Sequence, residues 1–131
     1  MPFDFASKSK KDIEALIKEM RATMEAANGI GLAANQIGVG LRVFVAKVDN
    51  KFYAIFNPEI IKSEELIRVD GEGCLSVPER FGTLKRYNKV VLKGYDRNGK
   101  VLKIKAWNLL AWVFQHEIDH LDGKLFIDRL K

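Results

Sequence analysis

Two histidines and a glutamate near the C-terminal end of the sequence have the spacing of a metal site. The stretch QHEIDHLDG, residues 115–123, contains His116, Glu117 and His120. Side chains four positions apart lie one turn above each other on the same face of a helix. Both imidazoles can therefore bind one ion, with the glutamate beside it. A catalytic zinc or iron site takes three protein ligands and leaves one position open, so a third ligand is needed.

The third ligand must be a cysteine, an aspartate or a glutamate, because the chain has only these two histidines. Its single cysteine, Cys74, lies in the glycine-containing stretch DGEGCLSVPE, residues 70–79. A lone cysteine is most often a small apolar core residue, and a helix can carry this histidine spacing without a metal. We predict Cys74 as the third ligand because the carboxylates, which stay open as alternatives, have no distinctive setting.

One thiolate and two neutral imidazoles suit zinc, iron(II), cobalt(II) or nickel(II). A bound dication lowers the pKa of a coordinated water toward about 7, which gives a nucleophile at neutral pH. Glu117 follows the first histidine ligand, His116, on the flank of the same helical face. It is therefore placed to take a proton from the water and pass it to a leaving group.

Hydrolysis of a carbonyl also needs hydrogen-bond donors for the developing oxyanion. A first glycine-rich stretch, GIGLAANQ, ends at Gln36, which offers a side-chain amide. The backbone N–H of Leu75, directly after the cysteine, offers a second donor. Glycines in both stretches allow a substrate chain to approach the backbone closely.

Length and composition predict one ordinary globular domain that spans residues 1–131. The chain is 47% apolar and 30% charged, which is typical of such domains. A single cysteine allows no internal disulfide and favours a reducing compartment. No apolar run reaches the roughly 20 residues of a membrane span, and the N-terminus lacks the features of a secretory signal. We therefore expect a cytoplasmic protein with no membrane partner.

The formal net charge of +5 favours encounters with acidic partners. The lysines are scattered, and no run of five or six appears. We interpret them as a solvated surface, and a weak affinity for RNA or the ribosome is the alternative.

Hydrophobic periodicity predicts a helix at each end with strands between them. Residues 9–28 have one apolar stripe at helical spacing, and Asn28-Gly29 ends it. Residues 59–69 are expected to be extended or irregular. The predicted strands are 41–48, 51–56, 90–95 and 101–106, with turns at 49–50 and 96–99, and residues 108–121 form the last helix. This pattern predicts an α+β fold with mostly antiparallel strands.

Three stretches of the sequence together resemble the signature motifs of the peptide deformylases. They are GIGLAANQ (29–36), EGCLS (72–76) and QHEIDHLDG (115–123), and they occur in the family's order. The resemblance extends from about residue 10 to the end. It implies hydrolysis of the N-formyl group from the initiator methionine of nascent peptides, with release of formate. It also implies the family's fold, with antiparallel sheets around a central metal-binding helix.

The resemblance assigns roles to individual residues. The metal ligands are Cys74, His116 and His120, and the general acid–base is Glu117. The oxyanion donors are Gln36 and the Leu75 N–H, and the backbone of Gly31 pairs with the substrate peptide. Residues that match positions lining or bordering the methionine pocket are Ile30, Glu72, Arg86, Leu109, Trp112 and Val113. The family implies iron(II) as the native metal, with nickel, cobalt or zinc also supporting activity.

The sequence departs from the family pattern at several places. It lacks the usual Pro-Asp-Pro-x-Leu segment and, after Lys131, the C-terminal helix with which many bacterial members dock on the ribosome, so we expect no docking by that helix. Asn108 stands where glycine is frequent. Trp112 replaces a small, aliphatic or basic residue, which predicts an altered preference for the side chain after the formyl group. We expect a monomer from a bacterial cell; the short length also suits a bacteriophage-encoded or organelle-derived form.

Two other functions were weighed. A zinc endopeptidase shares the helix motif but not the two glycine-rich stretches, and it usually takes a third histidine or a glutamate as ligand. A catalytically inactive relative with a structural metal would need a site closed by four protein ligands, and here closure would require a carboxylate.

Overall fold

The computed structural model describes residues 3–5, 8–74 and 77–123, and along 67–74 and 77–85 it describes the backbone alone. Two helices and a short 3-10 helix accompany a five-stranded antiparallel sheet with strand order β1-β2-β3-β4-β5. The elements are α1 (Lys10–Ala26), β1 (Gly31–Ala33), η2 (Ala34–Ile37), β2 (Val43–Val48), β3 (Lys51–Cys74), β4 (Val77–Tyr95), β5 (Val101–Trp107) and α2 (Asn108–Leu121). The predicted α+β class is confirmed.

The first helix forms as its sequence predicts. The Ser9 hydroxyl accepts a hydrogen bond from Asp12 N at 3.1 Å, and the Asp12 carboxylate accepts one from Ser9 N at 3.5 Å. This reciprocal cap satisfies two N–H groups that the helix cannot pair internally. The buried residues at helical spacing are Ile13, Ile17, Met20 and Met24. Asn28 has a φ of 55°, and the helix has ended two residues earlier.

Both predicted tight turns are present. Asp49 and Asn50 have φ values of 53° and 65°, which are in the left-handed region. Two consecutive residues with positive φ form the turn whose twist matches that of the two strands in a hairpin. In the β4–β5 hairpin the Asp96 carboxylate accepts hydrogen bonds from Asn98 N and Lys100 N, at 2.8 and 3.0 Å. Gly99 there has a φ of 80°, which favours glycine.

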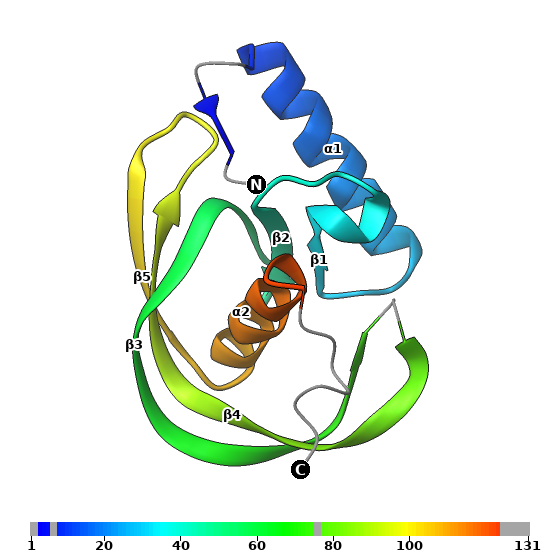
Figure 1. Cartoon of the computed structure of the whole chain (residues 1–131), viewed down its shortest axis with the longest axis vertical. Coiled ribbons are helices and arrows are strands. Elements are labelled where there is room, and N and C mark those ends of the chain that lie inside the picture. Colours follow the sequence, from blue (N-terminus) through cyan, green and yellow to red (C-terminus); the bar gives the residue numbers. More distant parts are fainter. Residues whose placement is uncertain (1–2, 6–7, 75–76, 124–131) are drawn as a thin grey trace.

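The sequence predicted a strand over 51–56. Its predicted end at Phe56 is wrong, because this strand, β3, continues to Cys74. Asn57 and Pro58 lie inside the strand at a shift of its register with β4, between Phe56 and Glu59. Asn57 has a φ of 49°, so the strand bends there and accommodates a proline that cannot donate to the ladder. The length of β3 and β4 lets them curve beneath α2 (Figure 1).

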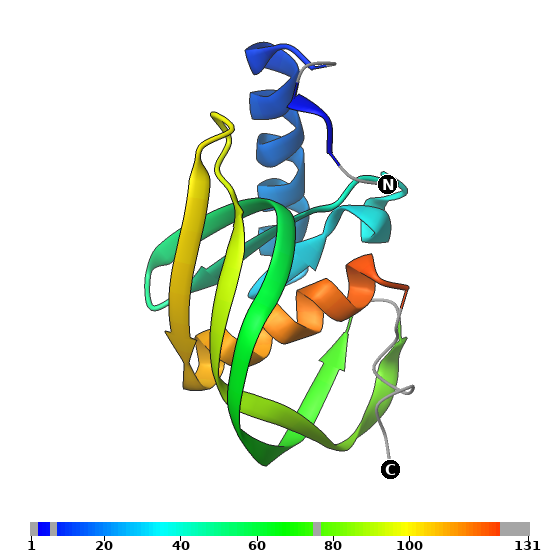
Figure 2. The same cartoon turned by 60° about the vertical axis from the view of Figure 1, so that its left-hand side comes forward.

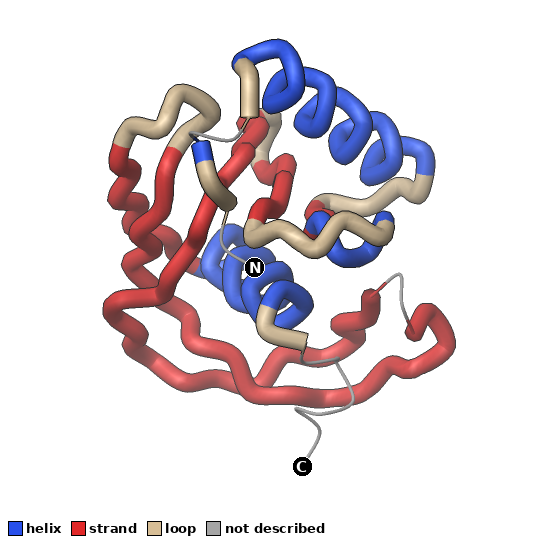
Figure 3. The backbone as a smooth tube through the Cα atoms, turned by 45° about the horizontal axis from the view of Figure 1, so that its top comes forward, coloured by secondary structure: helices blue, strands red, loops and turns tan. Residues whose placement is uncertain are grey.

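The sheet buries both of its faces at β2, as its alternating side chains show. Phe44 and Ala46 of β2 point to the core beneath α2, whereas Val43 and Val45 point to the core beneath α1. The remaining strands wrap around α2, which crosses the concave side of the sheet (Figures 2 and 3). The α2 side chains that fill this core are Ala111, Val113, Phe114 and Ile118. The helix is therefore held on several sides by strands.

The N-terminal segment is attached to the bend of β3. The Asn57 side chain accepts a hydrogen bond from Phe3 N at 2.6 Å and donates one to Phe3 O at 2.9 Å. The ring of Phe3 packs edge-on against Phe56, with centroids 4.8 Å apart. Within the described residues, no helix has both the length and the hydropathy needed to span a bilayer.

Candidate metal centre and active site

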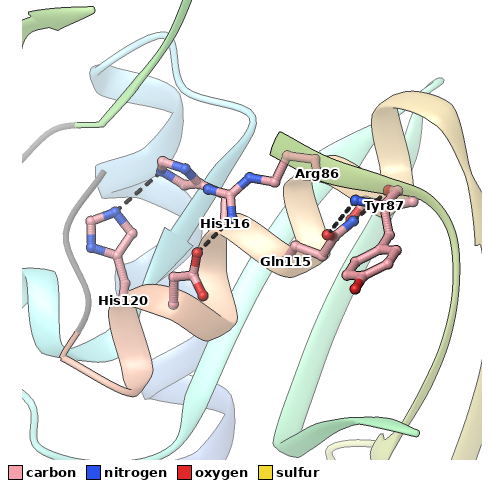
Figure 4. A network of polar contacts seen from close by, with 7 residues as sticks. Arg86, Tyr87, Gln115, His116 and His120 are labelled. Atoms are coloured by element: carbon pink, nitrogen blue, oxygen red, sulfur yellow. Dashed lines mark hydrogen bonds and ion pairs between the residues drawn. The ribbon is translucent and has the colours of Figure 1, made fainter. Parts of the chain in front are cut away.

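The helix α2 spans the residues that the sequence predicted, and it presents His116 and His120 on one face. It begins at Asn108, whose φ is 53°. This left-handed conformation explains why a glycine would also suit the position, and asparagine is among the few other residues that adopt it readily. Gln115 fixes the helix to β4: its amide accepts a hydrogen bond from Tyr87 N at 2.8 Å and donates one to Tyr87 O at 2.6 Å (Figure 4). β4 pairs with β5 from Lys89 onward, so the Gln115 amide provides hydrogen bonds to β4 two residues before that pairing begins.

The two imidazoles converge. The Nε2 atoms of His116 and His120 lie 3.2 Å apart, and the ring planes make an angle of 71° (Figure 4). Two imidazole nitrogens bound tetrahedrally to one zinc at the usual bond length are about 3.3 Å apart. The pair thus already has the separation that two ligands of one ion require. His120 is 4% exposed.

Glu117 lies against the backbone of β1. Its side chain is 4% exposed. A Cβ atom built on Gly31 would lie 2.5 Å from Glu117 Oε2 and 3.1 Å from its Cγ. Glycine at position 31 is therefore what allows the carboxylate to occupy this place. The contact brings the predicted acid–base and the predicted substrate-binding backbone together.

The first glycine-rich stretch is tied to the end of α2. Asn35 donates a hydrogen bond from its Nδ2 to the carbonyl oxygen of His120, at 2.5 Å. This carbonyl belongs to the last turn of α2 and also accepts a hydrogen bond from Gly123 N at 3.0 Å. The neighbouring Gln36 accepts a hydrogen bond from Ala33 N on its Oε1, at 2.9 Å. Because the oxygen of the amide accepts this hydrogen bond, the NH₂ group is the part of the Gln36 side chain that fits its predicted role as a donor.

The sequence matches the family model described as polypeptide deformylase over residues 2–131. The chain belongs to the polypeptide deformylase family. A peptide deformylase from Heliobacterium modesticaldum is 50% identical over 116 residues, which are 88% of this chain and 76% of the relative. One from Syntrophobacter fumaroxidans is 49% identical and shares 89% of this chain and 73% of its own length.

Solved deformylase structures have the same fold. A peptide deformylase from Legionella pneumophila superimposes with a TM-score of 0.91 at 42% identity, covering 100% of this chain and 77% of that one. A class I type b deformylase from Acinetobacter baumannii, solved with Met-Ala-Ser bound, has a TM-score of 0.93 at 30% identity, with 98% and 87% coverage. The recognition made from the three motifs is confirmed.

Three of the residues predicted for the deformylase site fall outside the described side chains. Cys74 ends β3, and its backbone is described, but its side chain and that of Glu72 are not. Leu75 lies outside the described residues altogether. Among the side chains that the structure does describe, no three His, Cys, Asp or Glu gather as a metal site. The assignment of Cys74 as third ligand therefore stays a prediction.

The predicted methionine-pocket residues on α2 and before β1 differ in exposure. Ile30 and Leu109 are 46% and 44% exposed, whereas Val113 is 6% exposed. Trp112 is half-buried against the core beneath α2. Its Nε1 has no hydrogen-bond partner within the described part of the chain.

Arg86 lies in a different setting from the other predicted pocket residues. Its guanidinium is 3% exposed and contacts the Asp119 carboxylate at 2.5 Å (Figure 4). Both residues line a cavity of about 760 Å³ together with Gln115, Ile118 and Asp122. At 3.6 residues per turn Gln115, Ile118 and Asp122 face a different side of α2 from the two histidines, whereas Asp119, three positions after His116, lies beside it on the helix surface. Arg86 is thus linked by its ion pair with Asp119 to the helix that carries the histidines.

Sequence reasoning missed Asn35, Gln115 and Asp119 as residues that hold the site. Each one has a polar side chain inside a recognised motif, directly beside a residue assigned to chemistry. That position was a usable signal, because a polar group next to a ligand often orients it.

Proposed function

We propose that this chain is a metal-dependent hydrolase that removes the N-formyl group from the N-terminal formylmethionine of nascent peptides and releases formate. Membership of the deformylase family supports the reaction. The observation that carries the proposal is the contact of the buried Glu117 carboxylate with Gly31, beside the converging pair His116 and His120. This contact would bring a proton acceptor and a pair of metal ligands together with a strand at the edge of the sheet.

The metal would be held by His116, His120 and Cys74. The separation of the two Nε2 atoms supports this assignment for the histidines. When bound, the ion supplies Lewis acidity, which lowers the pKa of water and polarises the formyl carbonyl. We propose iron(II) as the native ion and zinc, nickel or cobalt as substitutes, since a mixed nitrogen and sulfur donor set accepts all four.

The proton moves through Glu117. Its carboxylate takes a proton from the attacking water as the C–O bond forms at the formyl carbon. The same carboxyl group then gives that proton to the methionine nitrogen as the C–N bond breaks, so formate and a free amine leave. The Gln36 NH₂ group and the Leu75 N–H are proposed to stabilise the developing oxyanion.

The substrate peptide is proposed to add to β1. This strand is at the edge of the sheet and pairs only with β2 in the described structure. An extended peptide can bind such an edge by main-chain hydrogen bonds, with Gly31 as its partner. Met-Ala-Ser bound to the Acinetobacter baumannii deformylase supports a methionine-first peptide as ligand.

The methionine side chain is proposed to enter beside α2. Ile30, Leu109, Trp112 and Val113 are proposed to border it, with Glu72 from the second motif. Arg86 stays a proposed residue of this pocket, and its ion pair with Asp119 also supports α2. The bacterial relatives support the cytoplasm of a bacterium as the place of action. A monomeric state and a bacteriophage origin stay predictions from the sequence.

The test is formate release from a formyl-methionyl tripeptide, using protein purified without oxygen and reloaded with nickel or iron, with the metal content measured in the same sample. We expect release that a chelator abolishes. Glu117→Ala and Glu117→Gln should retain the metal and lose at least about 100-fold in kcat. A Glu117→Ala variant with full activity would show that another group carries the proton. Cleavage of unformylated peptides without formate release would favour an endopeptidase.

A further inference from the structure

The positive charge of the chain is concentrated in one hairpin. Residues 89–107, which form the β4–β5 hairpin, contain six lysine or arginine side chains and one aspartate. Their net charge of +5 equals the formal net charge of the whole chain. The rest of the sequence therefore carries as many acidic as basic side chains. Lysines that looked scattered along the sequence are brought together by the fold, which is the asymmetry typical of a surface for a polyanion.

The strand register places these lysines on one face. Lys93 pairs with Lys103, and Val91 with Lys105. Directly opposed residues of antiparallel strands share a face of the sheet. The alternate residues Leu92 and Ala106 are buried in the core beneath α2, so the lysines point to the outer, convex side of the sheet, away from α2. In Figure 2 this is the side of β5 that faces away from α2.

Four of the basic side chains are available to a ligand. Lys89 is paired with Glu65, and Arg97 with Glu14. By contrast, four exposed lysines make no ion pair with any side chain that the structure describes; they are Lys93, Lys100, Lys103 and Lys105. Three of them, Lys93, Lys103 and Lys105, lie on the convex side by the strand register, and we call these three the lysine face; Lys100 lies in the turn before β5. The nearest carboxylate in the strand register is that of Glu59, opposite Lys93 on β3, so the charge is most concentrated along β5.

We propose that the lysine face binds the phosphate backbone of RNA. Along β5 the solvent side reads Val101, Lys103, Lys105 and Trp107, with Trp107 53% exposed. Alternate residues of a strand are roughly 7 Å apart, which is comparable to the spacing of successive phosphates along an RNA strand. An exposed aromatic ring at the end of a lysine row provides a surface on which a base can stack. This ring favours RNA over an acidic polypeptide.

The proposed binding would leave the active site accessible. Its biological role rests on the proposed function. The histidines and Glu117 lie on α2, on the concave side of the sheet, whereas the lysine face is on the convex side. An enzyme that acts on nascent peptides works beside ribosomal RNA. Lysines on an edge strand also discourage edge-to-edge aggregation, and the experiment below separates that role from binding.

The experiment measures binding of the full chain to a short fluorescein-labelled RNA with a single-stranded tail, by anisotropy over a series of salt concentrations. Lys103→Gln/Lys105→Gln is compared with Lys11→Gln/Lys18→Gln, which removes the same charge from exposed positions of α1. We expect the β5 pair to bind roughly tenfold more weakly at low salt and to reduce the salt slope by about 1.4, at about 0.7 per phosphate contact with a single strand. The α1 pair should match the unmodified chain.

Further measurements distinguish the binding of RNA from other roles of these lysines. Trp107→Ala should weaken binding to the tail, and light scattering should show that the β5 variant is monodisperse. Equal binding by the two lysine pairs, or no binding by the unmodified chain at low salt, would overturn the proposal. If poly-glutamate binds as tightly as RNA, the partner is an acidic protein and not RNA. Formate release is measured separately and should be unchanged in the β5 variant, so failure of RNA binding does not bear on deformylation.

Discussion

Replacement of Gly31 by alanine is the sharpest test of how the active site is packed. The new Cβ would lie 2.5 Å from Glu117 Oε2 and 3.0 Å from its Cδ. Ordinary contact between such atoms begins at about 3.5 Å, so the carboxylate must move by about 1 Å. A displacement of this size in a reacting group costs on the order of 100-fold in rate. We therefore expect kcat for formate release to fall about 100-fold.

The fold should tolerate the same change. Gly31 does not have the positive φ that disfavours alanine, and Glu117 can yield by rotating its side chain. The metal content should be unchanged, because the three atoms nearest the new methyl group all belong to Glu117 and none to a histidine. Gly29→Ala is the matched control: its Cβ would have no neighbour closer than 3.5 Å. It should retain activity.

The assay is steady-state formate release with the metal content of each sample measured. A loss confined to kcat supports displacement of the proton carrier, whereas a loss confined to KM would indicate impaired binding of the peptide by β1. The reasoning is refuted if Gly31→Ala retains kcat within about twofold of Gly29→Ala. In that case Glu117 either has another arrangement during turnover or does not transfer the proton.

Three further variants test the surroundings of the site. Gln36→Glu keeps an acceptor for Ala33 N but loses the donor NH₂, so we expect an unchanged melting temperature and a loss of about 100- to 1000-fold in kcat; full activity would remove Gln36 from the oxyanion site. Arg86→Met leaves the Asp119 carboxylate buried without this cation and should cost about 3–5 kcal/mol in urea unfolding. The double variant Arg86→Met/Asp119→Leu should recover most of that loss, and a double variant no more stable than the single would contradict the account. Trp112→Ile should change the ratio of kcat/KM between substrates that differ in the side chain after the formyl group; an unchanged ratio would show that Trp112 does not border that pocket.

Local patterns were enough to predict the helices and turns. The apolar spacing of 108–121 and the paired turn residues at 49–50 depend on neighbours in the sequence, and the structure has both as predicted. The end of β3 was not predictable in this way. Asn57-Pro58 normally ends a strand, and only the partner β4, which tolerates a shift in register there, lets β3 continue.

The convergence of the two histidines could be predicted from the sequence, whereas the residues that hold α2 in place could not. The histidine spacing follows from the geometry of one helix, so His116 and His120 could be read directly from the sequence. The contact of Arg86 with Asp119 joins residues 33 positions apart, and that of Asn35 with His120 joins residues 85 apart. No local rule pairs such residues, because their meeting depends on how the sheet curves around α2. The ion pair of Arg86 with Asp119 is the clearest example.

Because α2 follows all the strands in the sequence, its position has a consequence for how the enzyme folds during its synthesis on the ribosome. Strands β2 to β5 are synthesised first, and their apolar inner face, including Phe44, Val90 and Leu92, is buried only when Phe114 arrives. Until then the growing chain exposes a large apolar surface, which is where chaperones bind and aggregation begins. Catalytic competence and burial of that surface should therefore arise in the same late step, so that a copy interrupted before α2 is both inactive and prone to aggregate.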